Sequence, residues 1–395
     1  MTEEQLLFDD ANVPDWLLIE ILQRLPIKHI FMFKCVSKRW LTLISDPLFA
    51  RSYANRINHG TFQDSQDSQP WNLLFRYLFE VRILPSSMID DRVALNQFQD
   101  FTLPGFSLNF LPSEQDCPIK ILASSNGLLL CSESFYWQKN YYICNPFTRQ
   151  WISLPKPLKS LQSVAIGFIS KDNGGYNLVR IPVADSSSDN FLQLETFSSQ
   201  TGQWNCSMIH SPVPGYSIKT DSPVLHYNGN VHWLEFRHGK IITYNPDKDS
   251  GQLLRLMNLP DGKESEHLSL LGLSCGRFRY FEVTDTCQGP RNLCIWVLSD
   301  YDAQEWCLEY RIRFSDSWSN QDELNRFIPK DNFYIFPLAL HPFDLDLVYL
   351  GYGGCLVGYN LRTRKLEVVR RNVYSHQLLA FVFSPWPTMI PQPSW

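Results

Sequence analysis

The sequence lacks the short motifs by which most enzymes and metal proteins are recognised. It has no Cys-x-x-Cys pair, which argues against a zinc ribbon and thioredoxin-type chemistry. It also has no glycine-rich dinucleotide loop, no phosphate-binding P-loop, no Gly-x-Ser-x-Gly and no His-Glu-x-x-His. Nothing in it assembles a nucleophile, a base and an orienting group. We therefore expect a protein that is not an enzyme and that uses no cofactor.

The sequence is also poor in positive charge and in long apolar runs. Its 35 Lys and Arg residues are outnumbered by 40 Asp and Glu residues, for a net charge of −5. Because nucleic-acid and anionic-membrane binders usually carry a basic excess, we expect neither partner. No apolar run approaches the roughly 18 residues of a membrane span. The acidic start, Met-Thr-Glu-Glu, does not resemble a secretory signal, and we expect a soluble protein of the cytoplasm or nucleus.

Apolar and aromatic residues are abundant. The 395 residues are 44% hydrophobic and 14% aromatic, and the 25 prolines outnumber the 19 glycines. Many aromatics together with many turn residues favour β-structure. In a reducing compartment the ten cysteines are expected to be free thiols. This expectation includes Cys294 and Cys307, which flank a predicted hairpin and could face each other.

The region from Val13 to Ala50 has the periodicity of three short helices. Two apolar pairs four residues apart, Leu17 with Ile21 and Leu18 with Leu22, give the first helix a wide apolar face. A unit of about 40 residues cannot bury that much apolar surface in its own core. The surplus must face either the rest of the chain or an obligate partner.

The other two helices are marked by their ends. Pro26 ends the first helix, and an apolar stretch from Ile27 to Phe33 follows it. The third helix is predicted to start near Ser37 and to stop at Asp46-Pro47.

This region resembles an F-box. The run VPDWLLIEILQRLPIKHIFMFKCVSKRWLTLISDPLF covers nearly the whole motif in order, with Val13 where the family more often has leucine. The resemblance implies binding of a Skp-family adaptor and, through it, of a cullin scaffold. The adaptor surface is expected to use the apolar residues of the motif, because apolar anchors dominate interfaces. They are Pro14, Leu17, Ile21, Leu22, Leu25, Pro26, Ile30, Cys35, Val36 and Trp40.

Four basic residues lie in the same region, which has no acidic residue between Ile27 and Ser45. They either steer an acidic partner or form a solvated helix face. These residues are Lys28, Lys34, Lys38 and Arg39.

A polar run, NHGTFQDSQDSQP, follows the helical region. It is typical of a flexible connector. We therefore divide the chain into an N-terminal tail, residues 1–12, an F-box domain, 13–55, a flexible linker, 56–70, and an all-β domain, 71–395.

Within the all-β domain one pattern repeats five times. Each copy is a strand, a polar turn, and an aromatic or leucine anchor that opens the next strand. The anchors are spaced 53, 49, 53 and 60 residues apart, at Trp151, Trp204, Leu253, Trp306 and Leu366. A period near 50 is typical of a kelch-like propeller blade, whose anchors pack between neighbouring blades.

The turns of the repeats have a chemistry in common. Each begins with a side chain that can hydrogen-bond to the backbone two residues on. The turn residues are Asn145, Ser198, Asn245, Ser299 and Asn360. Hairpins are also predicted at Asn126-Gly127 and at Asn228-Gly229-Asn230.

Five blades can be recognised between Ile119 and Arg371. A sixth would be shared by the two ends of the chain, with Leu379–Phe383 joining strands from Trp71–Phe110 and so closing the ring. We favour six blades and keep seven open. The expected fold is α+β and multidomain, with a small all-α F-box of three helices followed by an all-β propeller.

The propeller region is similar to the F-box-associated domain of the large plant F-box family. The similar stretches are NGLLLC (126–131), YYICNPFTRQWISLP (141–155) and LAFVFSPWPTMIP (379–391). The resemblance implies a domain that chooses a target protein, although the sequence does not show which residues bind it. Tyr136 and Trp137 are candidates. The polar loop 184–190 is either a tolerated insertion, which we favour, or a further contact with the target.

Three functional readings remain. The favoured one is the substrate-recognition subunit of an SCF-type ubiquitin ligase, and the alternative is an F-box scaffold that degrades nothing. The third is a propeller enzyme with an incidental helical leader. His226, His232 and His238 are six residues apart, but spacing alone cannot show convergence on a metal. We expect them to be ordinary strand residues, with no metal site.

Overall fold

A computed structural model gives the fold. It describes residues 13–25, 27–46, 48–49, 52–53, 56, 71–75, 108, 110–112, 119–134, 138–146, 148–158, 164–171, 175–182, 191–210, 218, 224–235, 237–248, 254–260, 268–284, 292–314, 335–370, 378–382 and 390. The chain forms two compact units. We call residues 1–70 with 383–388 the helical unit, and residues 71–382 with 389–395 the sheet unit.

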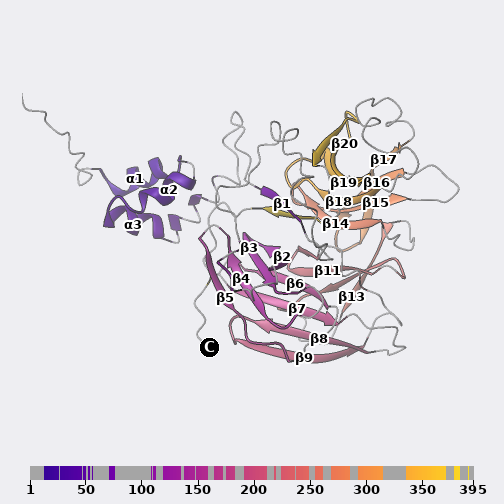
Figure 1. The fold of residues 1–395 in the computed structure, drawn as a ribbon, viewed down its shortest axis with the longest axis horizontal. Coiled ribbons are helices and arrows are strands. Elements are labelled where there is room, and N and C mark those ends of the chain that lie inside the picture. The colour runs from indigo at the N-terminus through magenta and orange to yellow at the C-terminus, as the bar shows by residue number, and fades with distance from the viewer. Residues whose placement is uncertain are drawn as a thin grey trace, which may run out of the picture. The chain divides into compact units, whose positions relative to one another are not determined.

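The helical unit contains α1 (Asp15–Leu22), α2 (Ile27–Phe33) and α3 (Lys38–Ser45) (Figure 1). The predicted start of α3 is confirmed, because the Ser37 side chain accepts a hydrogen bond from the Trp40 amide at 3.2 Å. The α3 helix stops at Asp46, as predicted. The α1 helix follows Pro14, which adopts an extended conformation and makes no side-chain cap. Proline is tolerated there because the first amides of a helix have no helical acceptor.

A small core holds the three helices together. Its buried members come from all three helices and from the residues after α3: Leu18, Leu22, Ile30, Ile44, Phe49 and Tyr53. The Tyr53 hydroxyl donates to the Leu25 carbonyl at 3.0 Å, which ties the end of the unit back to the residues after α1.

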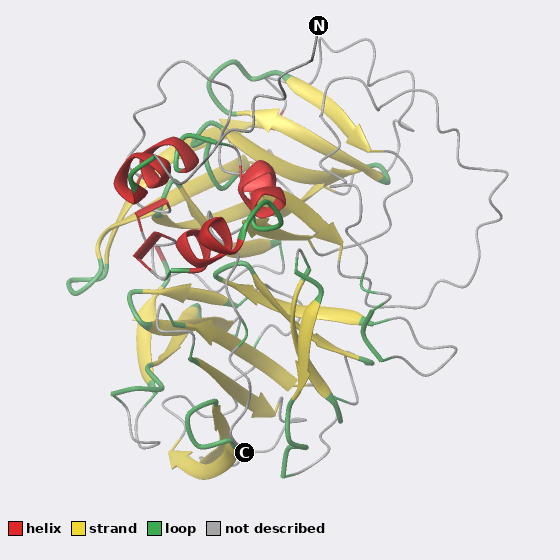
Figure 2. Cartoon of the chain, turned by 90° about the vertical axis from the view of Figure 1, so that its left-hand side faces the viewer, coloured by secondary structure: helices red, strands yellow, loops and turns green. Residues whose placement is uncertain are grey.

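The sheet unit contains five four-stranded antiparallel sheets, which we call blades 1 to 5, and strand supplies almost all of its regular structure (Figure 2). Within each blade the strands follow chain order. Blade 1 is β2 (Lys120–Ser125), β3 (Leu128–Ser132), β4 (Tyr141–Asn145) and β5 (Gln150–Ser153). Blade 2 is β6 (Val164–Ser170), β7 (Tyr176–Pro182), β8 (Phe191–Ser198) and β9 (Gln203–His210). Blade 3 is β10 (Leu225–Tyr227), β11 (Asn230–Glu235), β12 (Lys240–Tyr244) and β13 (Arg255–Asn258).

Blades 4 and 5 continue the same order. Blade 4 is β14 (Ser269–Ser274), β15 (Arg277–Thr284), β16 (Asn292–Asp300) and β17 (Glu305–Arg313). Blade 5 is β18 (Ile335–Leu340), β19 (Leu347–Tyr352), β20 (Cys355–Asn360) and β21 (Leu366–Arg370). The two remaining strands, β1 (Trp71–Phe75) and β22 (Leu378–Val382), pair antiparallel with each other.

The first strands of successive blades contact one another and form a ring. β2 contacts β6, β6 contacts β10, β10 contacts β14, and β14 contacts β18. β22 contacts both β18 and β2, so the two-stranded sheet formed by β1 and β22 closes the ring. The predicted pairing of the two chain ends is therefore confirmed.

The predicted number of blades is wrong. In the part of the chain that the structure describes there are five four-stranded blades, not six or seven. Among the described residues the closing sheet has two strands, one from each end of the chain, where a blade has four.

Apolar layers fill the spaces between neighbouring blades. Blades 1 and 2 share one buried cluster, and further clusters join blades 2 and 3, 3 and 4, and 4 and 5. Two of the predicted anchors bridge blades: the indole N–H of Trp204 donates to the Pro155 carbonyl at 2.8 Å, and that of Trp306 donates to the Asn258 carbonyl at 3.0 Å. Trp151 is 39% exposed, and Leu253 lies outside the described residues.

The predicted hydrogen bond from the amide two residues on is present in three of the five repeats, and in a fourth Asn145 accepts from the amide three residues on. The Oδ1 atoms of Asn145, Asn245 and Asn360, and the Oγ of Ser198, accept hydrogen bonds from amides two or three residues on. Ser299 does not do so; Asp300 accepts from the Asp302 and Ala303 amides instead, at 2.9 and 2.8 Å. The register of β16 with β17 shifts between Leu298 and Asp300, and this irregularity moves the turn by one residue.

Both predicted Asn-Gly hairpins are confirmed. Asn126 and Gly127 have φ angles of 48° and 74°, and Asn228 and Gly229 have 50° and 74°. Two successive positive φ angles match the twist of the flanking strands.

Candidate functional site

The two apolar pairs of α1 point in different directions. Leu18 and Leu22 lie in the core, 4% and 0% exposed, whereas Leu17 and Ile21 are 36% and 47% exposed. The wide apolar face predicted from the sequence is therefore two faces. Leu18 and Leu22 pack in the core formed with α2 and α3, and Leu17 and Ile21 are exposed.

The remaining members of the predicted adaptor-binding set are also divided between the surface and the core of the helical unit. Pro14 and Cys35 are exposed, and Val36 is 58% exposed. Ile30 is fully buried in the core of the unit.

Leu25 and Trp40 are half-buried against the same core. The Trp40 ring packs edge-to-face on Phe33, with ring centroids 5.2 Å apart. Pro26 lies outside the described residues.

Sequence reasoning missed four exposed apolar side chains of the helical unit. They are Trp16, Met32, Leu41 and Leu48, with exposures between 46% and 69%. Periodicity gives no signal for them, because a residue next to a core position in a short amphipathic helix fits either face.

The basic residues of the unit are less free than the sequence suggested. Arg39 of α3 forms an ion pair with Asp15 of α1, with Nη2 2.6 Å from Oδ1, which joins the two helices. Partial burial lowers the pKa of Lys34. Lys38 is exposed, and the Lys28 side chain lies outside what the structure describes.

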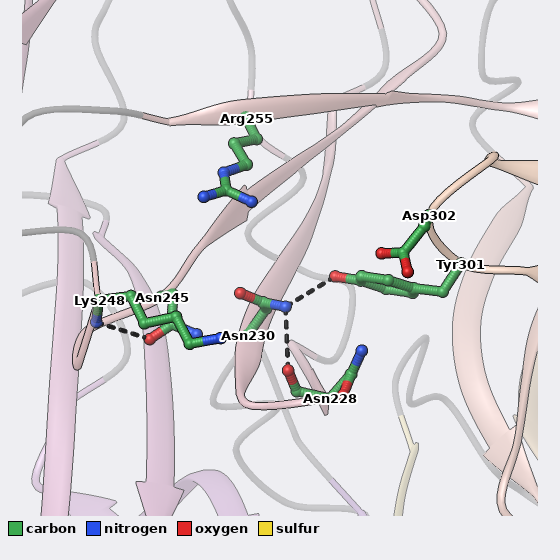
Figure 3. Close-up of a pocket in the computed structure, with 7 residues that line it drawn as sticks. All are labelled: Asn228, Asn230, Asn245, Lys248, Arg255, Tyr301 and Asp302. Atoms are coloured by element: carbon green, nitrogen blue, oxygen red, sulfur yellow. Dashed lines mark hydrogen bonds between the residues drawn. The ribbon is translucent and has the colours of Figure 1, made fainter.

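A second candidate site is a polar pocket of about 130 Å³ in the sheet unit. Blade 3 supplies Asn228 and Asn230 from its first hairpin, Asn245 and Lys248 from the β12–β13 connection, and Arg255 from β13. Blade 4 supplies Tyr301 and Asp302 from the β16–β17 turn. In Figure 3, Tyr301 extends from blade 4 toward Asn230, and Arg255 lies above Asn230 in the view with its guanidinium directed toward it.

A hydrogen-bonded chain fixes one wall of this pocket. His232 Nδ1 lies 3.2 Å from the Leu225 carbonyl and therefore carries the proton, because a carbonyl can only accept. His232 Nε2 then accepts from the Tyr301 hydroxyl at 2.8 Å, and the Tyr301 oxygen accepts from Asn230 Nδ2 at 2.9 Å. Burial lowers the pKa of His232 to about 4, so the ring is neutral near pH 7.

The other amides of the pocket have distinct roles. Asn245 uses its Oδ1 to accept from the Asp247 and Lys248 amides, each at 3.0 Å, which holds the turn that carries Lys248. Asn230 Nδ2 also donates to the Asn228 carbonyl at 3.0 Å. The nitrogen of Asn230 is hydrogen-bonded to Asn228 and Tyr301. The side-chain oxygen of Asn230 therefore points away from Tyr301 and faces the side of the pocket where Arg255 lies, as Figure 3 shows.

The structure does not bring the side chains of the three histidines together, and His238 lies in the turn after β11 rather than in a strand. Within the described ranges, no three His, Cys, Asp or Glu side chains gather in a way that could hold a metal. His238 instead pairs with Glu235, with Nδ1 3.4 Å from Oε1.

Cys294 and Cys307, which the sequence could have placed opposite each other, do not face each other. Cys294 lies opposite Arg311, and Cys307 lies opposite Val297. Both are free thiols, with Cys294 buried and Cys307 exposed.

Several residues and segments for which the sequence raised an expectation cannot be placed in the structure. Tyr136, Trp137, the loop 184–190, the tail 1–12 and linker residues 57–70 lie outside the described residues. Of the helices that the structure describes, none has the length and apolarity needed to span a membrane.

Comparison with known families identifies both units. The F-box domain matches residues 11–52, and the family described as "F-box protein At3g26010-like, beta-propeller" matches residues 89–384. The F-box protein At5g07610 of Arabidopsis thaliana is 27% identical over 320 residues, which cover 76% of this chain and 70% of that protein. The putative F-box/kelch-repeat protein At1g15680 of the same plant is 26% identical over 373 residues, covering 90% and 83%. The F-box protein At3g26010 is 26% identical over 374 residues, covering 91% and 79%.

Proposed function

The chain belongs to the F-box proteins with an At3g26010-like β-propeller, and from this premise we propose that it is the substrate-recognition subunit of an SCF-type ubiquitin ligase. The helical unit would bind a Skp-family adaptor, and through it a cullin scaffold. The sheet unit would bind the target protein.

The exposed apolar side chains of the helical unit carry the first half of the proposal. Leu17, Ile21 and Val36 leave between 36% and 58% of their surface in water although the unit already has a core. Clustered exposed apolar side chains are typical of an interaction surface. We assign them, with Pro14 and Cys35, to direct contact with the adaptor.

The buried members of the predicted set have another role. Leu22 and Ile30 are fully buried, so they hold the helices that present the contact residues. We extend the contact surface to Trp16 and Met32, which are 69% and 59% exposed.

The chain would work by proximity rather than by chemistry of its own. Tethering a target near a charged conjugating enzyme raises its effective concentration there. The ligase reaction itself belongs to other subunits, so we propose a non-catalytic receptor. Such an assembly works inside the cell, which is why we expect the chain in the cytoplasm or nucleus.

Co-purification with a Skp-family adaptor tests the proposal directly. Leu17→Asp should abolish the complex, because an unpaired carboxylate buried in an apolar interface costs several kcal/mol. An acidic residue in the first turn is compatible with α1, so the helix itself should persist. The matched control is Leu158→Asp in the sheet unit, where the side chain is 60% exposed.

Wild-type adaptor binding by a folded Leu17→Asp chain would refute this surface. Equal loss of binding in the Leu158→Asp control would show that the effect is not local to the helical unit.

The alternative function is an F-box scaffold that degrades nothing. Deleting residues 13–50 separates the two, because it removes the adaptor surface and leaves the sheet unit. A bound target should accumulate in cells if the chain delivers it for degradation. Unchanged target abundance would favour the scaffold.

A further inference from the structure

The polar pocket between blades 3 and 4 carries an inference that rests on the proposed function and gives the target a chemistry. The pocket lies at the strand ends where the β10–β11, β12–β13 and β16–β17 connections meet. It is lined by residues of two blades that are far apart in sequence. A small concave site with convergent polar groups is a candidate ligand site.

The charges of the pocket favour one negative group. Lys248 and Arg255 are cationic and Asp302 is anionic, so the three together carry one net positive charge. His232 stands behind Tyr301 and is neutral at pH 7, so it adds none. A single carboxylate would neutralise this charge, whereas a doubly charged phosphate would leave an excess next to Asp302.

The pocket is also held in shape before any ligand arrives. Tyr301 is fixed between His232 and Asn230, and the turn that carries Lys248 is closed by Asn245. Groups that are already ordered lose less conformational entropy on binding. The side chains of Lys248 and Arg255 approach the middle of the pocket from different elements, which suits recognition of one small anion (Figure 3).

We propose that this pocket binds the carboxylate of an acidic side chain, Asp or Glu, on the target protein. Lys248 and Arg255 form charge-assisted hydrogen bonds with the carboxylate. Asp302 disfavours a second negative charge at the same position. The volume of about 130 Å³ suits one side chain rather than a folded segment.

Peptide pools provide the test. The purified full-length chain is offered short synthetic peptides with randomised flanks and a fixed central Glu, Gln or phosphoserine. The Glu pool should bind more tightly than the other two. Lys248→Gln with Arg255→Gln should weaken binding of the Glu pool by about tenfold or more, because the carboxylate loses both cationic partners.

The matched control is Arg237→Gln with Lys240→Gln. These residues lie in and after the β11–β12 turn, at the opposite end of β12 from Asn245, and carry the same charges. The control should retain binding of the Glu pool. As a second variant, Asn230→Asp places a negative charge in the pocket and removes the two hydrogen bonds that the Asn230 amide donates, so it should also weaken that binding.

Each result decides the proposal. Equal binding of the Glu and Gln pools, or loss of Glu binding in the control as well, would overturn the site. Tighter binding of the phosphoserine pool would overturn the choice of a singly charged group. Adaptor co-purification is measured on the same chains, so a chain that binds the Glu pool but no adaptor refutes the proposed ligase role and not the pocket.

Discussion

The helical unit leaves large apolar side chains in water, whereas the sheet unit places even charged side chains in its interior. Among the described residues, the exposed apolar side chains of the helical unit include Trp16, Ile21 and Val36. In blade 2, by contrast, Arg180 and Glu195 are both fully buried and form an ion pair. The guanidinium of Arg180 also lies over the rings of Tyr141 and Trp204, 5.5 and 5.4 Å from their centroids.

This difference separates a unit that leaves apolar side chains exposed from one that encloses a charge pair in its interior. A small unit gains little from its own core, and contact with another protein surface would stabilise the apolar side chains that it leaves exposed. A closed ring of blades can surround a charge pair with aromatic rings and other polar groups.

Arg180→Met should cause the largest loss of stability. It leaves Glu195 buried without its partner, which costs about 3–5 kcal/mol. The double variant Arg180→Met with Glu195→Leu should recover most of that loss, because no unpaired charge then remains at this position of blade 2. Urea unfolding of the three chains measures both effects. A single variant that unfolds like the wild type would show that water reaches the pair.

Leu22→Ala should unfold the helical unit alone. Removing a buried leucine side chain costs about 2–5 kcal/mol, which is comparable with the whole stability of so small a unit. Calorimetry, with circular dichroism to follow helix content, should show the sheet transition unchanged. A joint loss of both transitions would contradict the division into two units.

Acid should destabilise the sheet unit through His232. Its folded pKa of about 4 lies below the ordinary value of 6.5, so the unfolded state binds a proton first as the pH falls. The stability contributed by the neutral ring is complete above pH 6.5 and is lost as the pH falls toward 4. Between pH 7 and pH 5 that loss amounts to about 2 kcal/mol.

His232→Gln should remove this share of the acid sensitivity, while the exposed control His29→Gln should not. The measurement is the denaturation midpoint of each chain at the two pH values. Burial lowers the pKa of His341 as well, to about 4, so some acid sensitivity should remain in the His232 variant. An unchanged pH dependence in that variant would mean that His232 is protonated without cost in the folded chain.

The smallest effect concerns the turn of blade 4. Asp300→Ala should cost about 1 kcal/mol, because two backbone amides lose their acceptor. Ser299→Ala should cost less, since the Ser299 hydroxyl only donates to the exposed Glu305 carbonyl, at 2.9 Å. Thermal unfolding of both variants would show which one loses more stability. A larger loss in Ser299→Ala would mean that Ser299, not Asp300, holds the turn.

Local features of the fold could be predicted from the sequence. Asn126-Gly127 marks a hairpin because both residues accept positive φ angles. Ser37 marks a helix start because its side chain can replace a helical acceptor. The β1–β22 pairing was also predictable, because a ring of sheets leaves no edge when the chain ends meet.

Features that depend on tertiary packing could not be predicted. Leu17 and Leu18 are adjacent leucines, and only the packed unit shows that Leu18 is buried and Leu17 exposed. The polar pocket joins Asn230 to Tyr301, 71 positions apart, and no local pattern links them. The predicted number of blades was wrong because the sequence pattern indicates how many strands the chain can form. It does not indicate how many of those strands pair in the closing sheet.

The most direct test of the comparison is adaptor binding by two chains that carry the same substitution in different units. Val36 in the helical unit and Met208 in the sheet unit are 58% and 64% exposed. Calorimetric titration with a purified Skp-family adaptor should show binding weakened about a hundredfold or more by Val36→Asp and unchanged by Met208→Asp. Wild-type binding by a folded Val36→Asp chain, or equal loss in both variants, would contradict the account.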